Sequence, residues 1–555
     1  MRSSPRLERW LPFLAWPRPD RAALAGEAVA GLTVGLMVIP QGVAYAALAG
    51  MPLVTGIYAS LLPALVAVLF SSSQRLSVGP TALTCLLIAS SLSGLATPGS
   101  PQWVELAVWL ALLSGLLQVA LGLVRFGWLL NIVSSPVLAG FTQAAAVLIL
   151  VSQLPDLLGM RSPWSALATQ PRFDWIEAAF GLGALAALVL SRRFTPRFPA
   201  VIAVVGAAAG LSAVSGFEAA GGRVVGPLAA GLPALHVPAW LPWTTLRELL
   251  VPVLAITLVS FLETASSAKV DSQRGGRRWD QDQDLIGQGL AKIASGLSGA
   301  FPTSSSFSRS ALNLYAGART GWATIFSVLV VLLALLLLMP ALYHVPQSVL
   351  AAVVVAAIYG LLNPRHFTRL WKFARVEAVT SGLTFLVTVT SAPRLFWGVI
   401  AGLLISLSHF LYQRLHPRII EVGLHPDGSL RDRHLWQLPP LAPDLYALRM
   451  DSALDFASAA YFERVLTEQL AARPGLRHVC LFAQPINRID ATGVEVFGQL
   501  RRMLAQHGIT LHLSGLKLPV ERVLQAAGEL PPGPHLRSYR TDAEALAALQ
   551  PRDVV

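Results

Sequence analysis

Long apolar runs follow one another, with only short breaks, from about residue 27 to residue 415. Hydrophobic residues make up 54% of the 555-residue chain and charged residues only 13%, whereas a soluble domain usually carries about a quarter charged residues. A soluble core cannot bury so much apolar surface, but a lipid bilayer can. Because each crossing needs roughly 20 apolar residues, the pattern predicts a polytopic α-helical membrane domain over 27–415.

The apolar runs divide into two sets of seven candidate spans. The first set lies near 27–49, 53–70, 80–95, 104–124, 131–151, 173–191 and 198–215, and the second near 248–270, 284–300, 305–318, 321–340, 346–362, 376–391 and 393–412. Several runs are shorter than a full crossing, so the exact number stays open. Two sets of equal size favour a seven-plus-seven transmembrane inverted repeat.

The net charge of +12 fits either a nucleic-acid partner or the loop bias of a membrane protein. The basic residues sit in short loops between apolar runs, which favours the membrane interpretation and no nucleic acid. With the N-terminus inside, most of them fall in inside loops, for example at Arg75, Arg125, Arg197, Arg277 and Arg278. We therefore expect a protein of the inner cell membrane with both termini in the cytoplasm.

The two ends of the apolar region set the expected domain limits. Residues 1–26 are rich in arginine and resemble a cytoplasmic arm more than a cleaved signal. Beyond residue 415 charged residues become frequent, so we expect a linker over 416–433 and a soluble domain over 434–550. The two cysteines, Cys85 and Cys480, lie in different regions and exclude a disulfide framework or a metal knuckle. No cofactor is expected.

Each half of the membrane region contains one short segment interrupted by Gly, Pro and Ser. These segments cover residues 77–84, with Pro80, and 299–310, with Pro302. A proline at a first helical turn costs no internal hydrogen bond, so each segment predicts a half-helix that begins within the membrane. The free N–H groups and the macrodipole of such an end attract anions. Paired interrupted segments also indicate a transporter's binding site, although close helix packing is the alternative.

Hydroxyl and charged side chains lie in and near these segments. Candidate donors to an anion are Thr81, Thr84, Ser304, Ser305, Ser306 and Ser308. Arg309 is a charged residue at membrane depth, which is costly and usually functional; it either faces the site or reaches water or a carboxylate partner. Gln41 and Tyr45, four residues apart in the first span, either bind substrate oxygen or bond between helices.

Glu263 is the clearest acid inside an apolar run. Removal from water favours its neutral form, so it is a candidate for coupling proton uptake to anion binding. Two alternatives stay open. Glu263 is a structural partner of Arg309 or Lys269, or it is a sodium ligand together with Ser267 and Ser305.

At these residues the chain resembles the SulP (sulfate permease) family of anion transporters. The resemblance rests on IPQGVAYAALAGMP at 39–52, GIY at 56–58, SVGPTA at 77–82, FLE at 261–263, AK at 268–269, IGQGLA at 286–291, SRS at 308–310 and GART at 317–320. It implies the seven-plus-seven fold and an elevator-like movement of a core against a gate domain. It also implies a homodimer, and a site bordered by Gln41, Tyr45, Thr81, Ala82, Ser306, Phe307 and Ser308.

The resemblance leaves the substrate and the coupling ion open. The family includes carriers of sulfate, bicarbonate, chloride and dicarboxylates. Glu263 matches the acid linked to symport in proton-coupled members, whereas related sodium-coupled bicarbonate carriers have Asp there. We therefore expect proton-coupled symport of a small anion, with an exchanger, a sodium-coupled symporter or an anion channel as alternatives. Since no motif of a membrane enzyme is present, we do not expect an enzyme.

The C-terminal region alternates strands and amphipathic helices from about residue 444, which predicts an α/β fold. The stretch IDATG at 489–493 resembles the STAS domain (sulfate transporter and anti-sigma antagonist), which implies a cytoplasmic domain that binds regulators. In the bacterial antagonists a phosphorylated Ser or Thr follows the Asp. Here Ala491 follows Asp490, so that switch is not expected; Thr492 is a candidate helix cap.

Overall fold

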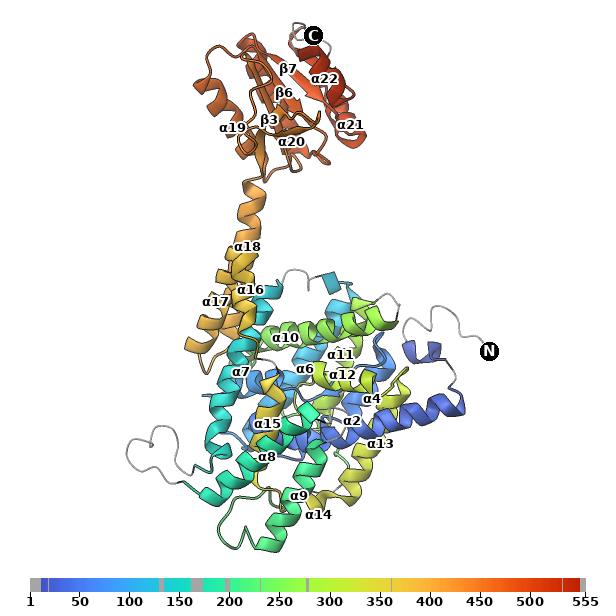
Figure 1. The fold of residues 1–555 in the computed structure, drawn as a ribbon. Helices are drawn as coiled ribbons and strands as arrows, with labels where there is room; N and C mark the ends of the chain where they lie inside the picture. Colours follow the sequence, from blue (N-terminus) through green and yellow to red (C-terminus); the bar gives the residue numbers. More distant parts are fainter. Residues whose placement is uncertain are drawn as a thin grey trace. The chain divides into compact units, whose positions relative to one another are not determined.

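The computed structural model describes residues 11–17, 19–128, 134–160, 173–194, 200–229, 231–275, 279–360, 362–531 and 533–549. Residues 1–10 of the expected arm and the loop arginines 197, 277 and 278 lie outside this part of the chain. Two compact units are present, Met1–Ser406 and Leu407–Val555 (Figure 1).

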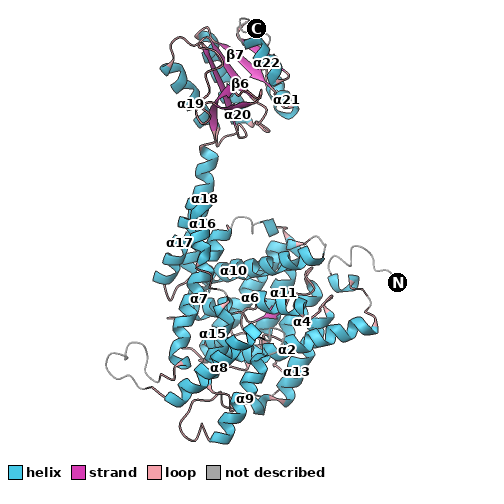
Figure 2. Cartoon of the chain, in the orientation of Figure 1, coloured by secondary structure: helices cyan, strands magenta, loops and turns pink. Residues whose placement is uncertain are grey.

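The first unit is helical apart from two very short strands (Figure 2). Its first half contains η1 (Pro12–Ala15), α2 (Arg21–Leu48), α3 (Thr55–Tyr58), α4 (Leu62–Phe70), β1 (Val78–Gly79), α5 (Ala82–Leu92), α6 (Pro101–Leu123), α7 (Ser135–Leu157), α8 (Trp175–Phe194) and α9 (Ala200–Ser215). Its second half contains α10 (Trp243–Gly275), α11 (Gln281–Leu297), β2 (Ser304–Ser305), α12 (Phe307–Tyr315), α13 (Trp322–Leu337), α14 (Met339–Leu342), α15 (Gln347–Tyr359), α16 (Arg365–Phe373), α17 (Arg375–Thr390) and the start of α18 (Phe396–Leu415).

Five of the described helices are long and apolar enough to cross a membrane, namely α2, α6, α7, α10 up to Lys269, and α18. Shorter apolar helices follow the other expected runs, among them α5, α8, α9, α13 and α15. The helical, polytopic character expected from the sequence is therefore confirmed. The expected run at 305–318 is shortened to α12, because β2 and Ser306 precede it in extended backbone.

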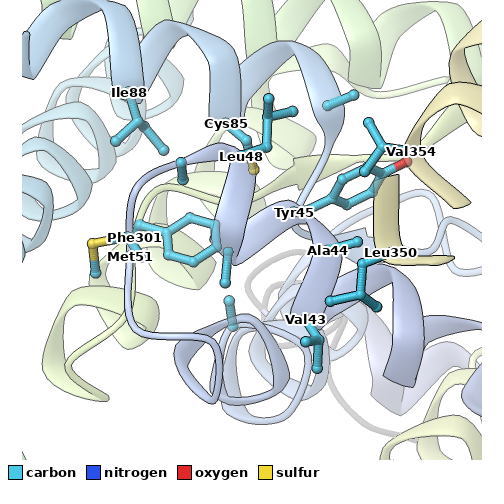
Figure 3. Close-up of a cluster of buried hydrophobic side chains, with 14 of the residues drawn as sticks. Val43, Ala44, Tyr45, Leu48, Met51, Cys85, Ile88, Phe301, Leu350 and Val354 are labelled. Atoms are coloured by element: carbon cyan, nitrogen blue, oxygen red, sulfur yellow. The ribbon is translucent and has the colours of Figure 1, made fainter. Parts of the chain in front are cut away.

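The helices of this unit pack as two groups. One group contains α2, α4, α5, α6, α10, α11, α12 and α13, and the other contains α7, α8, α9, α15 and α17. The groups meet along α2, which contacts both α15 and α9. Figure 3 shows part of this core, where the ring of Tyr45 from α2 lies near Val354 of α15.

Glycines allow α2 to pack closely against its neighbours. A Cβ on Gly31 would lie 2.5 Å from the Ala323 carbonyl oxygen, and a Cβ on Gly56 would lie 1.9 Å from the Gly42 carbonyl oxygen. The second contact brings α2 and α3 together at backbone distance. No hydrophobic force drives helices together in lipid, and small residues at such crossings allow the close van der Waals packing that does.

We expect Gly56→Ala to destabilise the membrane unit by about 1–3 kcal/mol, because the added methyl group must displace backbone. Thermal unfolding of the detergent-solubilised protein measures this loss. Gly26→Ala is the control, since Gly26 lies in α2 and nothing lies within 4 Å of its Cβ position. Equal unfolding temperatures for the two variants would contradict the packing argument.

The helix α2 begins at Arg21, earlier than the expected limit at residue 27, because Asp20 caps it and accepts from the Ala23 N–H at 2.6 Å. Glu27 is buried inside the unit. Its carboxylate accepts from the N–H groups of Arg319, Thr320 and Ala323. It thereby satisfies donors at the start of α13, as an acidic cap does.

The second unit is an α/β fold. Its sheet has the order β4-β3-β5-β6-β7-β8, with β3 (Ile419–Leu424), β4 (Leu430–Asp432), β5 (Leu445–Met450), β6 (His478–Phe482), β7 (Thr510–Ser514) and β8 (Leu536–Tyr539). The strands β5 to β8 run parallel, and β3 is antiparallel to β4 and β5. The α/β fold expected from the sequence is confirmed. However, β3 and β4 belong to the sheet, so residues 419–432 are not the linker that we expected.

Helices cover both faces of this sheet. The face with Leu448 and Leu481 packs against α19 (Ala459–Ala472), α20 (Ala491–Gln506) and α21 (Leu518–Ala526). The other face, with Ala447 and Phe482, packs against α22 (Asp542–Leu549).

Asp490 caps α20. Its carboxylate accepts from the N–H groups of Gly493 and Phe456, both at 2.9 Å. Desolvation alone would raise the pKa of this carboxyl, but these backbone N–H groups and the field of Arg488 hold the pKa below its usual value. The capping residue is therefore Asp490 and not Thr492, which lies exposed in the first turn of the helix.

Candidate functional site

Two extended segments from the two halves of the membrane unit pair with each other. The strands β1 and β2 are antiparallel, with Val78 opposite Ser305 and Gly79 opposite Ser304. The Ser306 N–H extends the pairing by donating to the Ser77 carbonyl oxygen at 2.9 Å. The helix α5 starts directly after β1, and α12 starts directly after β2. The pairing therefore holds the N-termini of two short helices in one region.

Each of these helices is capped by a hydroxyl group. Thr81 Oγ1 accepts from the Thr84 N–H, and Ser306 Oγ accepts from the Arg309 N–H, both at 3.4 Å. The N–H groups of the first two helical residues have no acceptor within a helix. These residues are Ala82 and Leu83 in α5, and Phe307 and Ser308 in α12.

A cavity of about 630 Å³ opens beside these helix ends. It is lined from one helix group by Thr33, Met37, Gln41, Tyr45, Thr81, Ala82, Leu83, Glu263, Ser266, Ser306, Phe307, Ser308, Ala311, Leu312 and Tyr315. From the other group it is lined by Leu138, Thr142, Leu188, Ser191, Ala200, Val201, Val353, Ala356, Ala357 and Ile358, with Gly360 just beyond α15. Ala82, Leu83, Phe307 and Ser308 are all among these residues, so the N-terminal ends of both helices border the cavity.

The expected site residues divide into those that line the cavity and those behind it. Gln41, Tyr45, Thr81, Ala82, Ser306, Phe307 and Ser308 line it, as does Glu263. Pro80, Ser304, Ser305 and Arg309 do not belong to the lining. The Ser304 hydroxyl donates to the Ser260 carbonyl oxygen at 3.2 Å, and Ser305 Oγ accepts from Gln288 at 3.5 Å. Both serines therefore connect β2 to the neighbouring helices α10 and α11.

Arg309 joins the two paired segments from behind the cavity. Its side chain is almost fully buried. Nη1 donates to the Pro80 carbonyl oxygen at 2.8 Å, and Nε donates to Ser77 Oγ at 3.3 Å. Its guanidinium thus holds the residue before Thr81 against α12 and adds positive charge behind both helix ends.

Glu263 places a carboxylate at the wall of the cavity. Its Oε2 accepts from Thr81 Oγ1 at 3.0 Å and from Thr84 Oγ1 at 3.4 Å. The acid on α10 is therefore hydrogen-bonded to the capping residue of α5. Whatever changes the protonation of Glu263 acts directly on the helix end that faces the cavity.

The serines of the alternative sodium set form hydrogen bonds to a backbone oxygen and to a side-chain amide. The Ser267 hydroxyl donates to the backbone oxygen of Glu263, one turn earlier in α10, at 3.1 Å. Ser305 lies opposite Val78 in the strand pair and accepts from Gln288. Among the described residues, no group of three or more His, Cys, Asp or Glu side chains is placed to hold a metal ion.

Lys292 is a buried basic residue that was not predicted from the sequence as part of the site. Lys292 lies in α11, and its ammonium donates to Gln118 Oε1 and Ser260 Oγ, both at 2.8 Å. The signal was present, because a lysine inside the expected span 284–300 is as unusual as a glutamate inside the span 248–270.

Comparisons with known proteins agree with the fold and with the motifs. The model of the sulfate permease family matches residues 24–384, and the model of the STAS domain matches residues 440–537. The chain is 30% identical to sulfate transporter 4.1, chloroplastic, of Arabidopsis thaliana, over 94% of this chain and 78% of that protein. It is 32% identical to a protein of Mycobacterium tuberculosis named a probable sulfate transporter, over 94% of each.

Solved structures share the architecture. Murine Slc26a9, an anion transporter solved in the inward-facing state, has a TM-score of 0.86 at 20% identity, over 98% of this chain and 96% of that one. The transmembrane domain of the cyanobacterial bicarbonate transporter BicA has a TM-score of 0.59 at 20% identity, over 69% of this chain and 98% of that one. The chain therefore belongs to the sulfate permease family of anion transporters, as a multi-pass membrane protein with a C-terminal STAS domain.

Proposed function

We propose that this protein transports a sulfate-class oxyanion together with a proton. The observation that carries the proposal is the cavity in which the free N–H groups of α5 and α12 lie beside the Glu263 carboxylate. Backbone N–H groups at helix ends suit an oxyanion, because several can donate to it without a fully buried cation. The names of the Arabidopsis and Mycobacterium relatives support sulfate over bicarbonate or a dicarboxylate.

Proton coupling follows from the position of Glu263. An ionised carboxylate repels an incoming anion, and a protonated one does not. Proton uptake at Glu263 and anion binding at the helix ends therefore favour each other, and such coupling is reciprocal. A similar bovine protein, 29% identical over 95% of this chain, is named a sodium-independent sulfate anion transporter, which supports protons over sodium.

An elevator-like movement is the mechanism that we propose. The cavity lies between the two helix groups, with both helix ends and Glu263 on one group and α7, α8, α9 and α15 on the other. Movement of the first group against the second would carry the bound anion and the proton together. The basic residues of the short loops support an orientation with both termini in the cytoplasm.

Uptake into proteoliposomes tests this function. We expect radiolabelled sulfate to accumulate above its equilibrium level when the outside is made acidic, and to stop doing so when a protonophore collapses the gradient. Sodium gradients at equal pH should have no effect. Accumulation driven by sodium, or only downhill flux under a proton gradient, would contradict proton symport in favour of sodium coupling or a channel.

A further inference from the structure

The buried lysine of α11 is not used by the site as described so far. Lys292 is fully buried, with 0% of its surface exposed. Its two partners are neutral, and Gln118 in turn donates from Nε2 to Ser260 Oγ at 3.0 Å and to the Thr257 carbonyl oxygen at 3.2 Å. In the part of the chain that the structure describes, no carboxylate oxygen lies within 4.0 Å of the Lys292 ammonium.

A charged lysine in this buried environment has a high free-energy cost. Burying an ammonium group costs several kcal/mol unless a counter-charge or hydrogen bonds compensate it. A structural tether between α6, α10 and α11 needs no charge, because an amide would form the same neutral hydrogen bonds. The charge itself therefore calls for an explanation.

The hydrogen bonds of Lys292 lead directly to the anion site. Ser260, which accepts from Lys292, lies one turn before Glu263 on α10, and residues three apart share a helix face. The Ser260 carbonyl oxygen accepts from Ser304 in β2. Lys292 therefore lies behind the pairing of β1 and β2, within range of the electrostatic field of Glu263.

The charges around the site can be counted. Among the described residues, Glu263 lies in the fields of Lys292 and Arg309, and Tyr45 and Cys85 are further titratable groups near Arg309. With Lys292 and Arg309 as cations and Glu263 as a carboxylate, the buried cluster has a net charge of plus one. Protonation of Glu263 then raises that charge to plus two.

We propose that Lys292 determines charge selectivity, by making the proton-loaded site doubly positive and thus suited to a divalent oxyanion. This proposal rests on the proposed proton-coupled transport and deepens it. Without Lys292 the proton-loaded site carries a single positive charge, which suits a monovalent anion. Sulfate and a dicarboxylate share the divalent charge, and competition by succinate distinguishes them from each other.

The test compares variants at Lys292 in proteoliposomes, using radiolabelled sulfate uptake and its inhibition by nitrate. Lys292→Met and Lys292→Gln should each lower the preference for sulfate over nitrate by at least about tenfold, because a divalent anion loses twice the Coulomb attraction of a monovalent one. Lys292→Arg should keep the preference. Arg394→Gln, which removes an exposed charge of the same unit, should also keep it.

The possible results distinguish a failure of the proposed role of Lys292 from a failure of the proposed function. A wild-type preference in Lys292→Gln would overturn the proposal, as would equal loss of both anions in a variant that unfolds at the wild-type temperature. Lys292→Gln retains hydrogen-bonding groups, so it keeps the test decisive should Lys292→Met not fold. If the wild type transports neither anion, the proposed function fails and not the role of Lys292 alone.

Discussion

Replacing Glu263 with glutamine should abolish proton-driven accumulation of the anion while leaving exchange of internal for external anion. Glutamine keeps the shape of the side chain and an oxygen that accepts from Thr81 and Thr84, but it cannot take up a proton. The site is then permanently in its neutral-acid form and still binds anion. Uptake measured with and without a pH gradient, alongside counterflow at equal pH, separates the two activities.

The control for this experiment is Glu105→Gln, which removes a carboxylate of the same unit that pairs with His236 at 2.9 Å, away from the lining of the cavity. It should respond to the proton gradient as the wild type does. An unchanged pH dependence in Glu263→Gln would contradict the role of this acid in coupling.

Arg309→Gln should reduce transport of every anion to near background. The variant loses the buried positive charge and the fork of donors that holds Pro80 and Ser77. A loss of about 3 kcal/mol of anion-binding free energy, within the range that a nearby charge supplies at an effective dielectric constant of about 20, corresponds to a loss of about a hundredfold in binding. Arg309→Lys should recover only part of the activity, because lysine supplies the charge without the planar fork.

Initial uptake rates and the unfolding temperature of each variant measure the effect. The exposed Arg394 gives the control Arg394→Gln, which should transport normally. Wild-type uptake by Arg309→Gln would show that the charge behind the two helix ends does not support binding.

The interrupted segments could be predicted from the sequence because their residues carry local conformational information, such as the hydroxyls of Thr81 and Ser306, which are typical N-caps. The expected position of the prolines at a first helical turn was wrong, because Pro80 precedes the cap of α5 and Pro302 lies before β2, five residues before Phe307. Two such segments at corresponding positions of the two halves indicated one site. The pairing of Gly79 with Ser304 then brings them together, which is a tertiary contact that no local pattern encodes.

The direction in which a side chain points could not be predicted. Arg309 is close in sequence to the residues that line the cavity, yet its guanidinium turns back to Pro80. The reason is geometric, because successive residues of a helix point about 100° apart and Ser308 already faces the cavity. Sequence reasoning likewise grouped Ser304 and Ser305 with the lining residues, although strand pairing directs both toward neighbouring helices.

Contacts between residues that are distant in sequence could not be predicted either. The environment of Lys292 depends on Gln118 and Ser260, which come from two other helices. The strands β3 and β4 fall within the expected linker, and only the pairing of β3 with β5 and of β4 with β3 identifies them as part of the sheet. Contacts of this kind depend on the whole fold.

The most direct test of the central claim is a structure determined with selenate, whose selenium can be located by anomalous scattering. We predict one selenate in the cavity, within hydrogen-bond distance of the N–H groups of Ala82 or Leu83 and of Phe307 or Ser308. Selenate bound elsewhere, or bound in the cavity with neither helix end within reach, would contradict the account.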